Sequence, residues 1–410
     1  MKIEKAIVVH GMGGYYNDDL EAIRAGAEKD GFVYLGDPCS PGFRSIREPN
    51  DAACFVLLLD SGHTVWGDAT SVCYASAGGR RGRFDVEEQL PFLSDICELL
   101  QGWDVSGFFE MSDNLEEQDF DSRLHLPAVM YGISQALLEA CALSQKMTPA
   151  EVVAKELGVE APDAKIPIYI QSDDRKNVVD KGILKQADTL PHGVINDVET
   201  TFGCEGELLK EYIGWIVERI EKFGEEGYNP EIHLDVYGLP GKVFEHDPDQ
   251  IADYLSELHK VASPLDLCIE TPVIMETRQA QIDMLGKIKY AISERGSPVN
   301  LVVDEHANGL GDIREFIKAG VVDMINVKSP DLGSIANTAR AIRECWSGNV
   351  RPILGGSCAE TDQSARMIAH VALAARPAWV MARPGLGVDE GMQIVYNEMV
   401  RTLAIIEARR

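Results

Sequence analysis

Three acidic residues stand at regular intervals in the C-terminal half of the sequence. Asp235, Glu270 and Asp304 each lie at or near the end of a short apolar run, 35 and 34 residues apart. This spacing is about one strand plus one helix, so the three runs are predicted to be consecutive parallel strands whose carboxyl ends meet at one rim. Any one of them alone would more commonly cap the next helix. Because crowded carboxylates repel one another without a cation, the ordered trio favours a Mg²⁺ site.

Lys328 and Asn326 belong to the next apolar run, residues 322–328. They are two positions apart, so both side chains face the same side of the predicted strand. A lysine at the inner end of a barrel strand is costly unless it forms a pair or reacts. One interpretation is a Lys328 that extends to the rim or pairs with a neighbouring carboxylate. We favour a general base whose pKa is lowered by the adjacent metal and apolar walls.

Further polar side chains are predicted around the same rim. In residues 354–361, two glycines allow the backbone to approach a ligand closely, and Ser357 and Cys358 offer polar contacts. No histidine is evidently paired with Cys358, so a nucleophilic role for it is disfavoured. Gln171 follows a short apolar run and His192 comes after the first predicted barrel helix. His192 is either a structural residue or a second acid, base or hydrogen-bond donor.

A metal, a lysine base and a rim of hydrogen-bond donors together indicate one class of reaction. That class is removal of a proton from a carbon beside a carboxylate, with the resulting negative charge stabilised by the metal. The formal net charge of the chain is −28, which repels an anionic substrate at long range. Bound Mg²⁺ would supply the local cation that such a substrate needs.

The elements that must position these residues alternate between strand and helix from residue 166 onward. Seven or eight such units in roughly 250 residues predict an α/β fold, a modified (β/α)₈ TIM-type barrel, over residues 161–410. A doubly wound open sheet is the alternative, but no glycine-rich dinucleotide motif or P-loop is found. Residues 1–160 mix hairpins and helices and are predicted to form a separate α+β domain, with a polar, turn-rich boundary at 157–164.

Composition excludes several classes of protein. Apolar residues make up 45% and charged residues 25% of the 410 residues, the balance of a folded globular protein. The negative charge disfavours nucleic-acid and membrane-surface binding, and no apolar run is long enough to span a bilayer. The nine cysteines have no C-x-x-C pair, and the N-terminus lacks a signal-peptide pattern. We therefore expect a cytoplasmic protein that binds a small-molecule amino acid or carboxylate, with no nucleic-acid or membrane partner.

Short stretches along nearly the whole chain form an ordered set. They are Gly31-Phe32, Ala77-Gly78-Gly79-Arg80, Gln171-Ser172-Asp173-Asp174, Pro191-His192, His233-Leu234-Asp235-Val236-Tyr237-Gly238, Ile269-Glu270, Val303-Asp304-Glu305, Lys328-Ser329-Pro330-Asp331-Leu332-Gly333, Gly355-Gly356-Ser357-Cys358 and Pro384-Gly385-Leu386-Gly387-Val388-Asp389-Glu390-Gly391. Each stretch alone is a weak signal. In this order they resemble the methylaspartate ammonia-lyases, a family of the enolase superfamily.

The resemblance implies an enolase-like N-terminal α+β capping domain over the barrel, in a homodimer. It implies reversible elimination of ammonia from threo-3-methylaspartate to give mesaconate, with Mg²⁺ and a monovalent cation, K⁺. Positions matching the family's motifs would supply the metal ligands Asp235, Glu270 and Asp304, the base Lys328 that takes the C3 proton, His192 on the opposite face, and the substrate contacts Gln171, Ser357 and Cys358.

Four pocket positions depart from the family pattern. The family has Gln in place of Cys73 and Gln in place of Asn326. It has Thr in place of Ser357 and Leu in place of Met381. Cys73 lacks an amide that both donates and accepts, and Asn326 retracts its amide by one methylene. The resemblance thus includes these four positions among the substrate contacts but implies a changed pocket.

Two other functions are compatible with the same residues. Lys328 and His192 on opposite faces would suit a racemase or epimerase, and the same proton abstraction would suit a dehydratase acting on another carboxylate. A non-catalytic member of the family is the second alternative. Retention of all three carboxylates and the lysine argues against it, because a structural role would not require them together.

Overall fold

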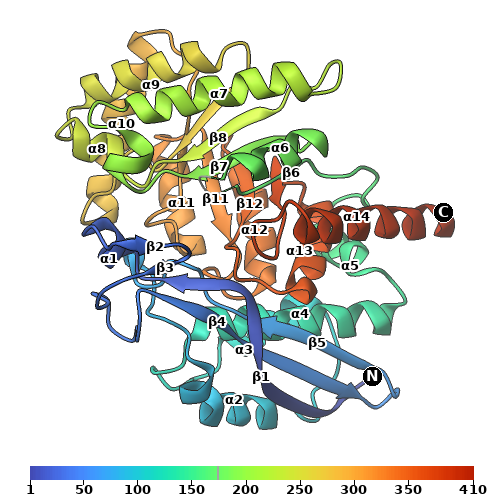
Figure 1. Ribbon diagram of the computed structural model, residues 1–410. Helices are drawn as coiled ribbons and strands as arrows, with labels where there is room; N and C mark the ends of the chain where they lie inside the picture. The colour runs from blue at the N-terminus through green and yellow to red at the C-terminus, as the bar shows by residue number, and fades with distance from the viewer. Residues whose placement is uncertain (173–174) are drawn as a thin grey trace.

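A closed barrel of eight parallel strands forms the C-terminal part of the chain (Figure 1). The computed structural model describes residues 1–172 and 175–410, so Asp173 and Asp174 of the predicted motif lie outside the described residues. The strands follow one another around the barrel in sequence order. They are β6 (Ile168–Tyr169), β7 (Thr189–Val194), β8 (Glu231–Asp235), β9 (Leu267–Glu270), β10 (Asn300–Val303), β11 (Met324–Lys328), β12 (Arg351–Gly355) and β13 (Trp379–Met381).

Helices follow the strands and surround the barrel (Figure 1). They are α6 (Lys176–Leu184), α7 (Glu207–Phe223), α8 (Leu239–Val243), α9 (Pro248–Ala262), α10 (Arg278–Glu294), α11 (Leu310–Ala319), α12 (Ile335–Ser347), α13 (Asp362–Ala375) and α14 (Glu390–Arg409). In α7 the fully buried residues recur every three or four positions, from Leu209 to Ile220, as expected for a helix with one face on the sheet. Asp247 caps α9 and accepts hydrogen bonds from two backbone N–H groups.

The predicted (β/α)₈ barrel is confirmed, and the open-sheet alternative is wrong because the sheet closes. The strand missed by the sequence reasoning is β7, which contains Pro191 and Gly193. These residues are unusual in strand interiors and concealed its apolar pattern. A register shift against β8 between His192 and Val194 marks the same place.

The N-terminal domain is an antiparallel sheet covered by helices. Its sheet has the order β1 (Ile3–Asp18), β4 (Arg47–Leu59), β5 (Thr64–Ala69), which includes the predicted hairpin. A short helix α1 (Leu20–Arg24) and a small hairpin, β2 (Lys29–Asp30) with β3 (Val33–Tyr34), follow β1. The remaining helices are α2 (Val86–Leu100), α3 (Phe108–Glu116), α4 (Leu126–Gln145) and α5 (Pro149–Leu157).

Helix α4 packs on this sheet against β4 and β5. Among the described residues, it is the one helix that is long and apolar enough to cross a membrane. However, 78% of its apolar window is buried inside the protein. It is therefore the core helix of the N-terminal domain.

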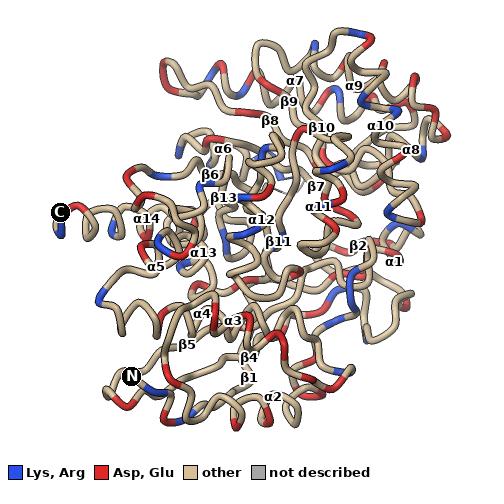
Figure 2. Tube along the Cα trace, turned by 180° about the vertical axis from the view of Figure 1, so that it is seen from behind, with Lys and Arg blue, Asp and Glu red and all other residues tan. Residues whose placement is uncertain are grey.

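The N-terminal domain is docked on the carboxyl ends of the barrel strands, where it forms a cap. The Gly14 N–H donates to the Ala359 carbonyl over 2.7 Å, and the Thr361 hydroxyl donates to Asp68 over 2.6 Å. Both barrel residues follow β12. Acidic residues are spread over the cap and the barrel alike (Figure 2), in keeping with the net charge of −28. The region between the two domains therefore needs its own cations to hold an anion.

Candidate active site

The three predicted metal ligands meet at the carboxyl ends of neighbouring strands. Asp235 ends β8, Glu270 ends β9, and Asp304 directly follows β10. Asp235 and Glu270 are paired in the strand register. One carboxylate oxygen from each of the three residues lies within 4.8 Å of those of the others, and no side chain is more than 1% exposed. The predicted convergence of the carboxylates is thus present.

Burial and mutual repulsion change the pKa values of these carboxylates. Burial, followed by the negative charges of Glu270, Glu305 and Asp304, raises the pKa of Asp235 well above its usual value of 3.8. Burial alone would also raise the pKa of Glu270, but His233, followed by His192 and Lys328, outweighs it and lowers that pKa to about 2. Buried oxygens at this separation, with a surplus of negative charge, fit a hard divalent cation such as Mg²⁺.

The loops that leave these strands share an unusual backbone conformation. Tyr237, Thr271 and His306 have positive φ values of 44°, 53° and 66°, although none is glycine. Each lies one or two residues after one of the three carboxylates. Such conformations cost free energy and persist where the surrounding structure imposes them, commonly at functional sites.

Lys328 ends β11 beside this cluster. Its Nζ lies 2.5 Å from Asp304 Oδ2. Burial and the charge of Arg80 each lower the pKa of Lys328, but the carboxylates of Asp304, Glu305 and Glu270 outweigh both and raise it. The sequence predicts a pKa lowered by a bound metal as well as by apolar walls, and without the metal the carboxylates have the opposite effect.

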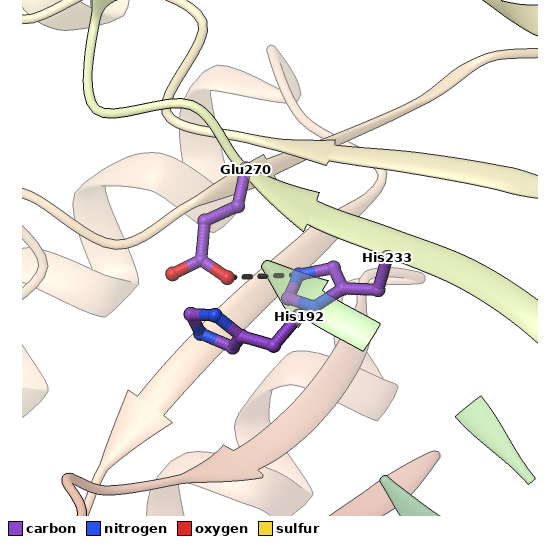
Figure 3. Close-up of side chains that lie close together, drawn as sticks. All are labelled: His192, His233 and Glu270. Carbon is purple, nitrogen blue, oxygen red and sulfur yellow. Dashed lines mark ion pairs between the residues drawn. The ribbon is translucent and has the colours of Figure 1, made fainter. Parts of the chain in front are cut away.

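Two histidines, His192 and His233, lie beside Glu270 (Figure 3). His233 Nε2 lies 2.8 Å from Glu270 Oε2, and both side chains are fully buried. The His192 ring lies edge-to-face with His233, at a centroid distance of 5.2 Å. His192 Nδ1 has no hydrogen-bond partner among the described residues. Burial is the main cause that lowers the pKa of His192, to about 3, so this ring is neutral at neutral pH.

A cavity of about 670 Å³ lies between the cap and the barrel. Six of the predicted site residues line it, and they come from both domains: Cys73, Gln171, His192, Lys328, Ser357 and Cys358. Gln171 Oε1 accepts a hydrogen bond from the Cys358 thiol. The Ser357 N–H donates to Glu360 over 2.9 Å, which holds the loop after β12 in place.

Two predicted substrate contacts lie elsewhere. Met381 is fully buried with Tyr169, Trp379 and other interior side chains of the barrel, and it does not line the cavity. Asn326 does not line it either. Its amide nitrogen donates to Glu270 Oε1 over 2.9 Å, so Asn326 holds a predicted metal ligand.

The sequence reasoning assigned no role to four residues that complete the cluster. His233 precedes Asp235 by two positions, so strand alternation places both on the same face. Glu305 directly follows Asp304, and Asp331 is three residues after Lys328. Arg80 contacts Asp304 over 3.0 Å from the cap. No sequence signal indicated this contact, because its two residues are far apart in the chain.

Comparison with known proteins gives a consistent result over the whole chain. The model of the methylaspartate ammonia-lyase N-terminus matches residues 1–158, and the model of its C-terminus matches residues 161–408. The methylaspartate ammonia-lyase of Citrobacter amalonaticus is 42% identical over 412 residues, covering 100% of both chains. The chain belongs to the methylaspartate ammonia-lyase family. It is accordingly an enzyme, a carbon–nitrogen lyase.

Solved structures agree with this family assignment. The Citrobacter enzyme containing (2S,3S)-3-methylaspartic acid has a TM-score of 0.96 at 43% identity, covering 99% of this chain and 100% of that one. The Mg complex of the Clostridium tetanomorphum β-methylaspartase has a TM-score of 0.93 at 38% identity, covering 100% of both. A dipeptide epimerase from Enterococcus faecalis, at 15% identity and a TM-score of 0.64, covers 95% and 92% and shows the fold alone.

We expect Asp235→Asn to stabilise the protein in the presence of a chelator and to weaken Mg²⁺ binding. The folded-state pKa of Asp235 lies above its value of 3.8 in the unfolded chain, so the ionised group destabilises the fold. The stability that the protonated Asp235 carboxyl group contributes is fully present below about pH 3.8. It is lost as the pH rises through the folded-state pKa. The gain in melting temperature over the wild type should therefore be larger at pH 8 than at pH 5.

Thermal unfolding with EDTA and then with Mg²⁺ measures both effects. Partly exposed Glu344, which pairs with Arg314 on the outer helices, gives a control in Glu344→Gln. The assignment of Asp235 as a ligand is wrong if Mg²⁺ raises the melting temperature of Asp235→Asn as much as that of the wild type.

Proposed function

We propose that this enzyme uses Mg²⁺ and Lys328 to eliminate ammonia from 3-methylaspartate or a closely related amino acid. The product would be mesaconate or the corresponding unsaturated acid. The observation that carries the proposal is the position of Lys328, which lines the cavity and lies 2.5 Å from one of the three clustered carboxylates. The substrate class follows from the relative that binds (2S,3S)-3-methylaspartic acid at 43% identity.

The residues that would hold the metal are Asp235, Glu270 and Asp304. When bound there, Mg²⁺ supplies positive charge that stabilises a substrate carboxylate as negative charge develops on it. His233 and Asn326 each contact a different oxygen of Glu270 and so orient this carboxylate. The support for this part is the Mg complex of the Clostridium relative, together with the burial and spacing of the three carboxylates.

Lys328 would remove a proton from the carbon beside the second carboxylate of the substrate. The electron pair of that C–H bond forms the carbon–carbon double bond, and the adjacent ammonium group leaves as ammonia with the C–N electron pair. The amine must be unprotonated to accept the proton. The surrounding carboxylates raise the pKa of Lys328, so neutralisation of their charge favours the active form.

His192 would act from the opposite wall of the cavity. Its depressed pKa, about 3, makes it a neutral hydrogen-bond donor rather than a cation. Its Nδ1 has no partner among the described residues, so a ring nitrogen remains available for a substrate carboxylate. Gln171, Ser357 and Cys358 line the same cavity and would fix the orientation of the amino acid.

We further propose that the enzyme is a cytoplasmic homodimer that uses K⁺ as well as Mg²⁺. The dimer and K⁺ are supported by the family resemblance alone. The cytoplasmic location is supported by nine cysteines that form no disulfide among the described residues. Light scattering that gave the mass of a single 45.0 kDa chain would contradict the dimer, and equal turnover in K⁺ and tetramethylammonium would contradict the use of K⁺.

We expect Lys328→Ala to lower kcat by roughly 10²–10⁴-fold, the usual contribution of a general base. The three carboxylates remain, so Mg²⁺ binding should persist. Mesaconate absorbance and ammonia release measure turnover, and calorimetry measures metal binding. A kcat within threefold of the wild type would rule out Lys328 as the base.

The same assay separates elimination from racemisation. Wild-type enzyme that exchanges substrate hydrogen for deuterium without releasing ammonia from any amino dicarboxylate would favour the racemase or epimerase alternative. Loss of this exchange in His192→Asn, with its retention in Lys328→Ala, would place the base on the opposite wall.

Cys73→Gln should raise kcat/KM for 3-methylaspartate by about fivefold, because a restored amide contact contributes about 1 kcal/mol. Cys73 lines the cavity on the cap side, where the family has Gln. Cys73→Met is the matched control, since it has similar length without the amide. Equal effects of Gln and Met, or no effect of Gln, would show that the amide at position 73 does not determine the substrate.

A further inference from the structure

An arginine of the cap enters the carboxylate cluster of the barrel. Arg80 Nη2 lies 3.0 Å from Asp304 Oδ1, and Nε lies 2.8 Å from Asp331 Oδ2. Arg80 Nη1 also lies 3.9 Å from Glu305 Oε1. The Arg80 side chain is only 3% exposed. A buried guanidinium is costly to desolvate, so it persists only where several acceptors satisfy it.

The turn before Arg80 contains two glycines that let the cap backbone lie close to the barrel. Gly78 and Gly79 both have positive φ, 56° and 82°, and a Cβ at Gly78 would lie 2.7 Å from Glu305 Cγ. The Gly78 carbonyl accepts hydrogen bonds from His306 N, over 3.2 Å, and from Asn308 Nδ2, over 2.7 Å. The cap segment is therefore fastened to the loop that follows Asp304, and Arg80 has a defined position over the barrel.

Arg80 and Lys328 bind the same carboxylate through different oxygens. Arg80 Nη2 contacts Asp304 Oδ1, and Lys328 Nζ contacts Asp304 Oδ2. The second partner of Arg80, Asp331, donates its backbone N–H to the Lys328 carbonyl over 3.0 Å. Arg80 thus holds both the side chain that contacts the Lys328 amine and the loop that follows it.

We propose that Arg80 is a positioning residue that acts through Asp304 and Asp331 to hold the Lys328 amine where it faces the cavity. This inference rests on the proposed role of Lys328 as the base. Arg80 is not among the described residues that line the cavity, so it does not act by touching the substrate. Catalysis in the barrel therefore depends on a docked cap.

The expected effect of losing Arg80 follows from the charges that remain. Arg80 and Lys328 both act electrostatically on Glu305 and Asp331. Without Arg80, Glu305 and Asp331 would attract the Lys328 ammonium away from Asp304 and the cavity. The chemical step should slow while substrate binding changes little, because the cavity-lining residues remain.

The test uses full-length Arg80→Met, which keeps most of the apolar stem and loses the charge. With 3-methylaspartate and saturating Mg²⁺, kcat should fall about 10–100-fold and KM should change less than threefold. Arg80→Lys, which keeps the charge but reaches fewer acceptors, should recover part of kcat. Arg81→Met is the matched control, since neighbouring Arg81 contacts the Leu124 carbonyl, and it should keep the wild-type kcat.

A crystal structure of Arg80→Met with Mg²⁺ gives a readout that does not depend on turnover. We expect Lys328 Nζ to lie away from the position that it has in a wild-type structure with Mg²⁺. An amine in its wild-type place overturns the proposal, as does an unchanged kcat or a fall in kcat that higher Mg²⁺ concentration restores. If Arg80→Met does not fold, the same criteria apply to Arg80→Lys and Asp331→Asn. Activity that persists in Lys328→Ala overturns the proposed function instead.

Discussion

The site depends on the free-energy cost of collecting negative charge in a place that water does not reach. Asp235, Glu270 and Asp304 lie at adjacent strand ends and are almost completely buried. Burial, followed by the repulsion of the neighbouring carboxylates, raises the pKa of Asp235, and a divalent cation would relieve this repulsion. The groups around them serve to distribute this charge: His233 contacts Glu270, and Lys328 contacts Asp304.

The two domains contribute different parts of this arrangement. The barrel supplies the carboxylates, Lys328 and His192, because parallel strands end at one rim. The cap supplies the roof of the cavity, including Cys73, and the guanidinium of Arg80 that reaches Asp304. Neither domain alone encloses the cavity. The close contacts at Gly14 and Gly78 leave no room for a side chain, which fixes how the cap sits on the barrel.

The four positions that depart from the family pattern differ in their consequences. Cys73 and Ser357 line the cavity, so changes at these positions can alter directly which substrate binds. Asn326 contacts Glu270 instead, so its replacement of Gln acts on a predicted metal ligand. Met381 packs in the barrel interior with Tyr169, whose ring stacks on His192 at a centroid distance of 6.1 Å. A change at Met381 would therefore reach the cavity through the packing under His192.

Much of the barrel and of its metal cluster could be predicted from the chain because the signals are local and periodic. Apolar runs and their spacing identify Asp235, Glu270, Asp304 and Lys328, since each strand end carries its own side chain to the rim. The β7 strand was missed where Pro191 and Gly193 break that pattern. The contact of Arg80 with Asp304 and the direction of the Lys328 pKa became known only from the fold. Both depend on the distances between charges that are remote in sequence, and those distances exist only after the cap has docked and excluded water.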